Sequence, residues 1–311
     1  MVMENYKITN TPNSTVITYG KETKLSLFEI CPGVMLSFNE VHSKYLPTMD
    51  SFLNECLLTI NYSLSGICEA FSVNHHYIYV KGGDLVISNE SASQSFHYPV
   101  GHYTGIELYL FEDAYTKGIS TLEQYDIDIQ TIIENYLNHG STFVTDSIDS
   151  LRIPLDFLMN LYKSGTPDIS LLRLNALLIL RLLTSGLSTL YPKSIRALTP
   201  GQMKNAKDAE AILTKDLSYR IPIREISDSM GISETSLKNY FYAVFGKTVS
   251  IYLLELRIEK AKELLKDQKL SILEIAHSVG YENQSKFTHM FHKNVGITPR
   301  DYRKQLLFYY T

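Results

Sequence analysis

The sequence predicts an α+β multidomain protein in which an N-terminal β-barrel and a helical segment precede an all-α C-terminal domain. Two observations carry this prediction. Short runs of alternating apolar and polar residues fill the first 120 positions, a pattern typical of strands. The last third contains one helix-turn-helix pattern twice, joined by a long helix, and such a repeat constrains the architecture strongly. We expect three regions, at residues 1–120, 121–198 and 199–311.

The duplicated pattern is centred on Gly231 and Gly280, which are offset by 49 residues. In each copy, apolar residues at helical spacing precede the glycine, and glycine tolerates the left-handed conformation that ends a helix. Ser233 and Asn283 follow as the expected N-caps of the second helices. Past the turn the offset becomes 50, and the equivalent pairs are Leu237 and Phe287, Phe241 and Phe291, and Tyr252 and Tyr302.

Residues 249–266 predict the helix that joins the two copies. Its roughly 18 residues would span about 27 Å at about 1.5 Å per residue. That length is of the order of one DNA turn, which separates successive major-groove segments on one side of the duplex. Two helix-turn-helix units on such a spacer are suited to reading two neighbouring major-groove segments.

Residues 221–304 resemble the AraC/XylS family of bacterial transcription regulators. The resemblance is carried by IREISDSMGISETSLKNYFYAVFGKTVSIYLLELRIEKAKELL and SILEIAHSVGYENQSKFTHMFHKNVGITPRDYRK. It implies sequence-specific binding to double-stranded DNA, control by a small organic effector, action as an activator through RNA polymerase, and a homodimer.

The match to the family's reading positions assigns base contacts to the two recognition helices. Lysine can donate to guanine, and asparagine or glutamine can pair with the edge of adenine. The expected base-contact residues are Thr235, Lys238, Asn239, Gln284, Ser285 and His289. The family often has arginine where this chain has Asn239 and His289, which leaves the base preference open. The expected phosphate contacts are Arg224, Lys247, Lys286, Lys293 and Arg303.

The strand-like region 1–120 resembles the cupin-like jelly-roll sensor of the same family. Several short apolar runs are separated by turn signals such as Pro32-Gly33 and Gly82-Gly83-Asp84. Tyrosine combines an apolar ring with a polar tip and is suited to holding an organic ligand. Tyr77, Tyr79 and Tyr98 are therefore the expected effector-lining residues, although aromatic residues are also ordinary in strands.

The alternative is a cupin-type metal-dependent enzyme or metal sensor with an appended helical domain. Such a site needs clustered histidine and carboxylate ligands, and the chain offers the adjacent His75 and His76, then His97 and His102. Adjacent residues on a strand point to opposite faces, so we expect no metal, no cofactor and no catalytic residue. An architectural DNA-binding protein is a third reading, which leaves the N-terminal region without a task.

Residues 121–198 predict helices at 127–138, 148–162 and 169–187. The third is apolar on nearly all sides, so it either packs into its own core or contacts a second copy; the resemblance favours a dimer contact. Arg173 and Arg181 argue against a membrane span. Residues 190–200, with two prolines, are the expected linker, and a helix at 202–217 opens the last domain.

Charge and cysteine content agree with this division. Residues 199–311 carry a net charge of +4, and residues 1–198 carry −8, an asymmetry that suits a protein with one end on phosphate. The first 20 residues lack the apolar run of a secretory signal. The three cysteines form no C-x-x-C motif and are expected to be reduced. We therefore expect a cytoplasmic protein.

Overall fold

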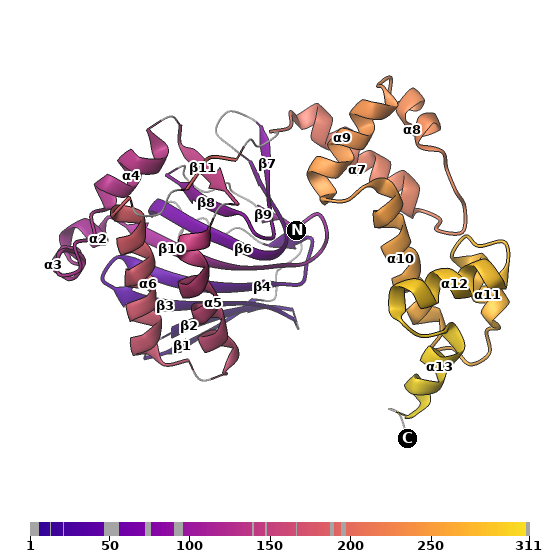
Figure 1. Cartoon of the computed structure of the whole chain (residues 1–311), viewed down its shortest axis with the longest axis horizontal. Helices are drawn as coiled ribbons and strands as arrows, with labels where there is room; N and C mark the ends of the chain where they lie inside the picture. The colour runs from indigo at the N-terminus through magenta and orange to yellow at the C-terminus, as the bar shows by residue number, and fades with distance from the viewer. Residues whose placement is uncertain are drawn as a thin grey trace. The chain divides into compact units, whose positions relative to one another are not determined.

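The computed structural model describes residues 6–12, 14–20, 22–46, 56–71, 76–89, 96–138, 140–146, 148–165, 167–186, 190–193 and 197–308. The chain divides into two compact units, Met1–Thr199 and Pro200–Thr311 (Figure 1). The first is built on an antiparallel sheet with helices against it, and the second consists of helices. The predicted fold class is confirmed.

The sheet of the first unit is antiparallel and curved. Its strands follow the order β1-β2-β3-β4-β10-β6-β8-β11, with β7 and β9 on the far part of β6 and β5 on β9. The central position of β10, between β4 and β6, joins segments that are distant in the sequence. The strands are β1 (Tyr6–Thr11), β2 (Ser14–Tyr19), β3 (Thr23–Cys31), β4 (Val34–Val41), β5 (Tyr45–Leu46), β6 (Cys56–Phe71), β7 (Tyr77–Lys81), β8 (Leu85–Ser88), β9 (Phe96–His97), β10 (Tyr103–Phe111) and β11 (Thr142–Thr145).

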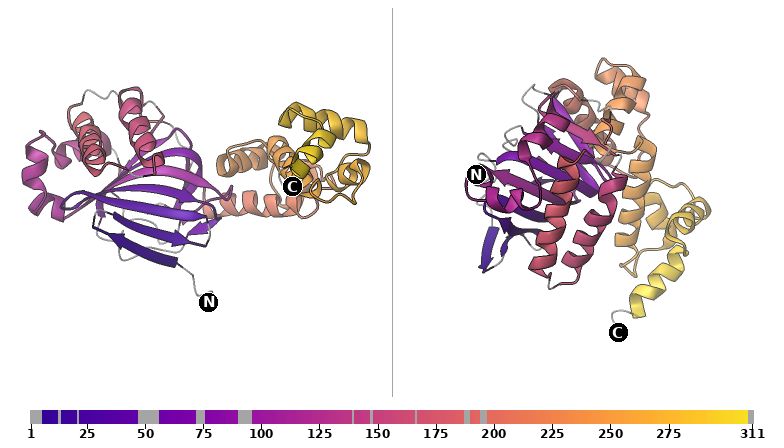
Figure 2. Two further views of the ribbon diagram at one scale, coloured as in Figure 1. Left: turned by 90° about the horizontal axis from the view of Figure 1, so that it is seen from below. Right: turned by 60° about the vertical axis from the view of Figure 1, so that its left-hand side comes forward.

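Helices cover one face of this sheet (Figure 2). The covering helices are α5 (Asp149–Lys163) and α6 (Ile169–Thr184), while α2 (Asp113–Thr116) and α3 (Ile119–Glu123) lie at one end of the sheet and α4 (Ile129–Leu137) packs beside β8 and β11. The side chain of Asp168 caps α6 by accepting from the backbone of Ser170 and Leu171. The predicted third helix ends at Thr184 rather than Leu187, because Gly186 takes a left-handed φ of 65°.

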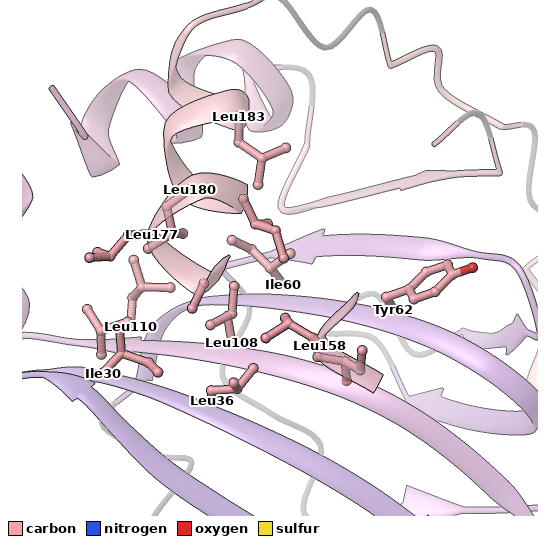
Figure 3. Close-up of a cluster of buried hydrophobic side chains, with 14 of the residues drawn as sticks. Ile30, Leu36, Ile60, Tyr62, Leu108, Leu110, Leu158, Leu177, Leu180 and Leu183 are labelled. Atoms are coloured by element: carbon pink, nitrogen blue, oxygen red, sulfur yellow. The ribbon is translucent and has the colours of Figure 1, made fainter. Parts of the chain in front are cut away.

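Sheet and helices share one hydrophobic core. Ile106, Leu108 and Leu110 alternate along β10 and belong to this core. Leu108 and Leu110 lie on the side of the sheet that faces the leucines of α6 (Figure 3). Tyr162 of α5 stacks on Phe38 of β4, with ring centroids 4.3 Å apart. Burying this apolar face is what holds the helical segment on the sheet.

The segment expected to act as a linker is bound to the first unit where it is described. Lys193 pairs with Asp84 at 2.7 Å and with Asp146 at 3.0 Å. The backbone of Leu198, which is fully buried, exchanges two hydrogen bonds with Tyr77 at 2.8 and 3.0 Å. Lys193 and Leu198 of the expected linker are therefore held against the first unit by ion pairs and backbone hydrogen bonds.

The second unit contains seven helices among the described residues 197–308. These are α7 (Pro200–Thr214), α8 (Ile223–Ser229), α9 (Glu234–Phe245), α10 (Val249–Leu264), α11 (Ile272–Ser278), α12 (Gln284–Val295) and α13 (Pro299–Phe308). The predicted joining helix is present as α10, two residues shorter than expected because Leu265 forms its C-cap. No helix in the described part of the chain has both the length and the apolar character to cross a bilayer.

Candidate functional site

The first helix-turn-helix is formed by α8 and α9. Gly231 takes a left-handed φ of 65° in the turn, and the hydroxyl of Ser233 caps α9 by accepting from the backbone of Ser236 at 3.1 Å. Leu237 and Phe241, on the inner side of α9, are fully buried. The predicted turn glycine and cap are both confirmed here.

The second helix-turn-helix repeats this arrangement with α11 and α12. Gly280 has a φ of 80°, and Asn283 caps α12 by accepting from the backbone of Lys286 at 2.9 Å. A β-carbon on Gly280 would lie 2.7 Å from the carbonyl oxygen of Leu217. Arg257, which is buried, donates from Nε to that same carbonyl at 3.1 Å. The second turn therefore needs glycine for packing as well as for its backbone conformation.

Helix α10 contributes to both halves of the unit. Near its start, Tyr252 packs against Phe241 and Phe245 of α9, and its hydroxyl donates to Glu210 of α7 at 2.8 Å. Toward its end, Ile258 and Ala261 enter the core beneath α11 and α12. Because one continuous helix belongs to both cores, it fixes the two helix-turn-helix motifs with respect to each other.

The predicted base-contact side chains all lie on the exposed sides of the two second helices. Lys238 forms an ion pair with Glu234 one turn earlier, so it must exchange this partner to reach a base. The exposed residues are Thr235, Lys238 and Asn239 on α9, and Gln284, Ser285 and His289 on α12.

The predicted phosphate contacts differ in how freely they are presented. Arg224 is exposed and 3.8 Å from Asp228, and Lys286 and Lys293 are exposed on α12. Lys247 is half-buried and paired with Glu255 at 2.6 Å. Arg303 is half-buried, and its Nε donates to the carbonyl of Leu265 at 3.3 Å, at the end of α10. That contact directs the guanidinium of Arg303 into the unit.

A hollow of about 560 Å³ lies beside the second turn, and sequence reasoning did not single it out. Arg220 lies over the ring of Tyr281, with its guanidinium carbon 5.6 Å from the ring centroid. The lining residues are Ser218, Tyr219, Arg220, His277, Gly280, Tyr281, Glu282 and Lys286. The Tyr219-Arg220 pair falls between predicted helices, where the helix periodicity gave no signal.

On the first unit, the sheet face opposite the helices carries a polar network centred on Glu107 of β10. Asn61 of β6 and Tyr109 both donate to its carboxylate, and the hydroxyl of Tyr103 donates to Asn61 at 2.9 Å. Burial raises the pKa of Glu107 to about 7, and hydrogen bonds from Asn39 and Asn61 act in the opposite direction. Sequence reasoning missed this group, although Tyr103, Gly105, Glu107 and Tyr109 alternate with apolar residues.

The structure separates the three tyrosines that were expected to line one pocket. Tyr79 donates to buried Glu69 at 2.8 Å, and Tyr77 and Tyr79 share one face of β7. Tyr98 instead packs with Val80 and Tyr103 in the cluster on the Glu107 side of the sheet. Of the three, Tyr98 is the one that lies with the polar network.

Among the described residues, no group of three or more histidine, cysteine, aspartate and glutamate side chains could hold a metal ion. His97 lies 3.5 Å from Glu69, and His102 is exposed. His75 lies outside the described residues, and so does any geometry it would share with His76.

The second unit is similar in sequence to known proteins. Residues 226–305 match the family described as a helix-turn-helix domain. The chain is 33% identical over 106 residues to the transcriptional activator RhaR of Cronobacter sakazakii, covering 34% of this chain and 38% of that protein. It is 33% identical over 92 residues to an AraC-like transcription regulator of Streptomyces lividans, covering 30% of each.

Among solved structures, one similar chain is the C-terminal domain of the response regulator yesN from Fusobacterium nucleatum. It is 35% identical and has a TM-score of 0.30, covering 32% of this chain and 98% of that one. The match spans well under half the length of the RhaR and AraC-like relatives. The family match over residues 226–305 and the AraC-like relative identify the C-terminal unit of this chain as a helix-turn-helix domain of the AraC type.

Proposed function

We propose that this chain is a sequence-specific DNA-binding transcription regulator, an activator under the control of a small organic effector. The observation that carries the proposal is the pair of exposed second helices, α9 and α12, held by one helix that belongs to both cores. This arrangement supports reading of two major-groove segments, because each second helix presents polar side chains at its exposed positions. The relative from Cronobacter is named a transcriptional activator, which supports positive control. Contact with RNA polymerase is part of the same proposal.

Base reading is assigned to Thr235, Lys238 and Asn239 on α9, and to Gln284, Ser285 and His289 on α12. Phosphate contact is assigned to Arg224, Lys247, Lys286 and Lys293, with Arg303 able to join only by releasing Leu265. Phosphate contacts supply affinity that falls steeply with salt, whereas base contacts set the sequence preference.

The test is footprinting of the full chain on duplexes selected from a random pool. We expect two protected major-groove segments about 10 base pairs apart on one side of the duplex. Protection of a single segment would contradict the assignment of two recognition helices. A random duplex of the same length serves as the control for non-specific binding.

We further propose a homodimer through the exposed side of α5 and α6. Helix α6 buries Leu172, Ala176 and Leu180 in its own core. It still exposes Leu171, Leu174 and Leu178, which share one helical face. On α5, Ile153 is 80% exposed and Phe157 45%. Both readings of this segment therefore have support, since α6 is a core helix on one side and apolar on the other.

A cytoplasmic location follows from action on DNA and is proposed on that ground. We assign no catalytic role, because the relatives are named as transcription regulators and no observed cluster favours an enzyme. The effector is proposed to bind the first unit, on the Glu107 side of the sheet, where polar and aromatic side chains converge.

A further inference from the structure

The carboxylate of Glu107 lies at the centre of the sheet face that is not covered by α5 and α6. Within β10, Glu107 stands opposite Asn61 of the neighbouring strand β6 on one side and opposite Ser37 of β4 on the other. Glu107 and Asn61 stay only half-buried although strands flank them on both sides. Part of the surface of both residues therefore remains accessible to solvent.

The surroundings of Glu107 contain no compensating positive charge among the described residues. Its hydrogen-bond partners are the side chains of Asn39, Asn61 and Tyr109. A carboxylate that is partly removed from water and has no cation beside it is costly, so a ligand that brings a positive charge would be stabilised there.

Aromatic side chains stand beside the carboxylate. Tyr109 donates to it directly, and Tyr103 reaches it through Asn61. The Tyr98 and Tyr103 ring centroids are 5.3 Å apart. A β-carbon on Gly105 would lie 2.5 Å from the Tyr103 hydroxyl, so glycine at this position lets the ring lie across β10. Such rings favour cations and apolar groups on their faces.

We propose that the effector is a small organic cation, whose ammonium or guanidinium group pairs with Glu107 and whose apolar part lies against Tyr103 and Tyr109. The inference rests on the proposed function, because it names the ligand class of the effector-binding face. An anionic effector would be repelled by the carboxylate. A neutral polyol would leave the negative charge uncompensated.

The test uses the full-length protein and two matched probe series that differ in charge. One series is phenethylamine, 2-phenylethanol and phenylacetate, and the other is butylamine, butanol and butyrate. We expect an amine to raise the melting temperature, while the alcohol and the carboxylate of the same series leave it unchanged. Calorimetric titration of Glu107→Gln should show at least a tenfold weaker Kd for that amine.

Glu69→Gln is the matched control, because Glu69 is a buried carboxyl on β6 that contacts Tyr79 and His97 instead. This variant should bind the amine as the parent protein does. The inference is overturned if no amine stabilises the protein, if an alcohol or a carboxylate stabilises it equally, or if Glu107→Gln binds the amine unchanged.

If Glu107→Gln fails to fold, the preference of the parent protein among the three charges decides the question by itself. Binding to the selected duplex is measured on the same preparations. Loss of the amine preference with intact DNA binding would reject the ligand class alone. Loss of DNA binding in the parent protein would reject the proposed function.

Discussion

Phe241 and Tyr252 meet edge to face, with ring centroids 5.3 Å apart and ring planes at 82°. Their equivalents in the second repeat, Phe291 and Tyr302, meet at 5.6 Å and 76°. The duplication is thus preserved in side-chain packing as well as in helix order. In each copy the helix after the recognition helix supplies a tyrosine that closes the motif's core.

The first prediction concerns these two aromatic cores. Phe241→Ala and Phe291→Ala should each lower the free energy of unfolding of the second unit by about 3–5 kcal/mol, because a fully buried ring leaves a cavity. Urea unfolding of the full chain, followed by circular dichroism at a helix wavelength, measures the change. Tyr242→Ala, at a ring that is 52% exposed on α9, is the control. A loss as large in the control would argue against the core explanation.

The two turn glycines should respond differently to alanine. Both have positive φ, so each substitution costs about 1–2 kcal/mol of backbone strain. Gly280→Ala should cost more than Gly231→Ala, because the new β-carbon meets the carbonyl of Leu217, whereas Gly231 has no atom within 4 Å of that position. Comparison of the two unfolding midpoints tests the difference. Equal unfolding midpoints for the two variants would show that the loop at Leu217 can move to accommodate the new β-carbon at little cost.

Base readers and phosphate anchors should separate by substitution. Gln284→Ala and Lys238→Ala should change the preferred sequence, with each lost base contact costing about 1–3 kcal/mol on the selected site. Arg224→Ala should weaken selected and random duplexes alike. Fluorescence anisotropy on both duplexes measures this, with the exposed Lys204→Ala on α7 as the charge-matched control. Equal losses on both duplexes from Gln284→Ala would remove that residue from the base-reading set.

Glu107 should make the stability of the first unit depend on pH. Its pKa is raised from 4.5 to about 7 in the folded chain, so its contribution to stability is complete below about 4.5 and is lost as the pH rises through about 7. The loss is at most about 3.5 kcal/mol, since one pKa unit corresponds to about 1.4 kcal/mol. Asn39 and Asn61 are neutral, and burial keeps Tyr103 and Cys68 protonated in this range.

Thermal unfolding at several pH values between 4.5 and 8 measures this dependence. Glu107→Gln should flatten the profile and raise the stability at pH 8 relative to the parent protein. An unchanged slope in the variant would mean that other groups produce the dependence.

The exposed leucines of α6 give the prediction for the dimer. Leu174→Glu together with Leu178→Glu should shift the full chain from dimer to monomer in sedimentation, because two charges would face the proposed interface. Leu273→Glu, at a leucine that is 43% exposed on α11, is the control and should leave the mass unchanged. A monomeric parent protein would reject the interface.

The second unit could be predicted from the sequence in most of its detail, because its structure follows from local rules. Helical spacing of apolar residues, a glycine at each turn and a side-chain cap after it are all short-range features. They identified both helix-turn-helix motifs, their caps and the exposed side of each recognition helix. What they did not reveal is the loop at Leu217, which packs against Gly280 and Arg257 from 40 or more residues away.

In the first unit, the sequence indicated strands within residues 1–120 but not the strand β11 among the expected helices, and tertiary structure decided what the strands form together. Alternation in β10 marks two faces, but only the pairing of β10 between β4 and β6 brings Glu107 beside Asn61 and Asn39. The pairing of β7 and β9 with the far part of β6 puts Tyr79 on the same side as Glu69 and His97, and Tyr98 on the other side with Val80 and Tyr103. Strand order depends on contacts between distant residues, and a local pattern carries no information about them. The sequence by itself therefore determined the DNA-binding unit, while the composition of the candidate effector face was decided by the sheet.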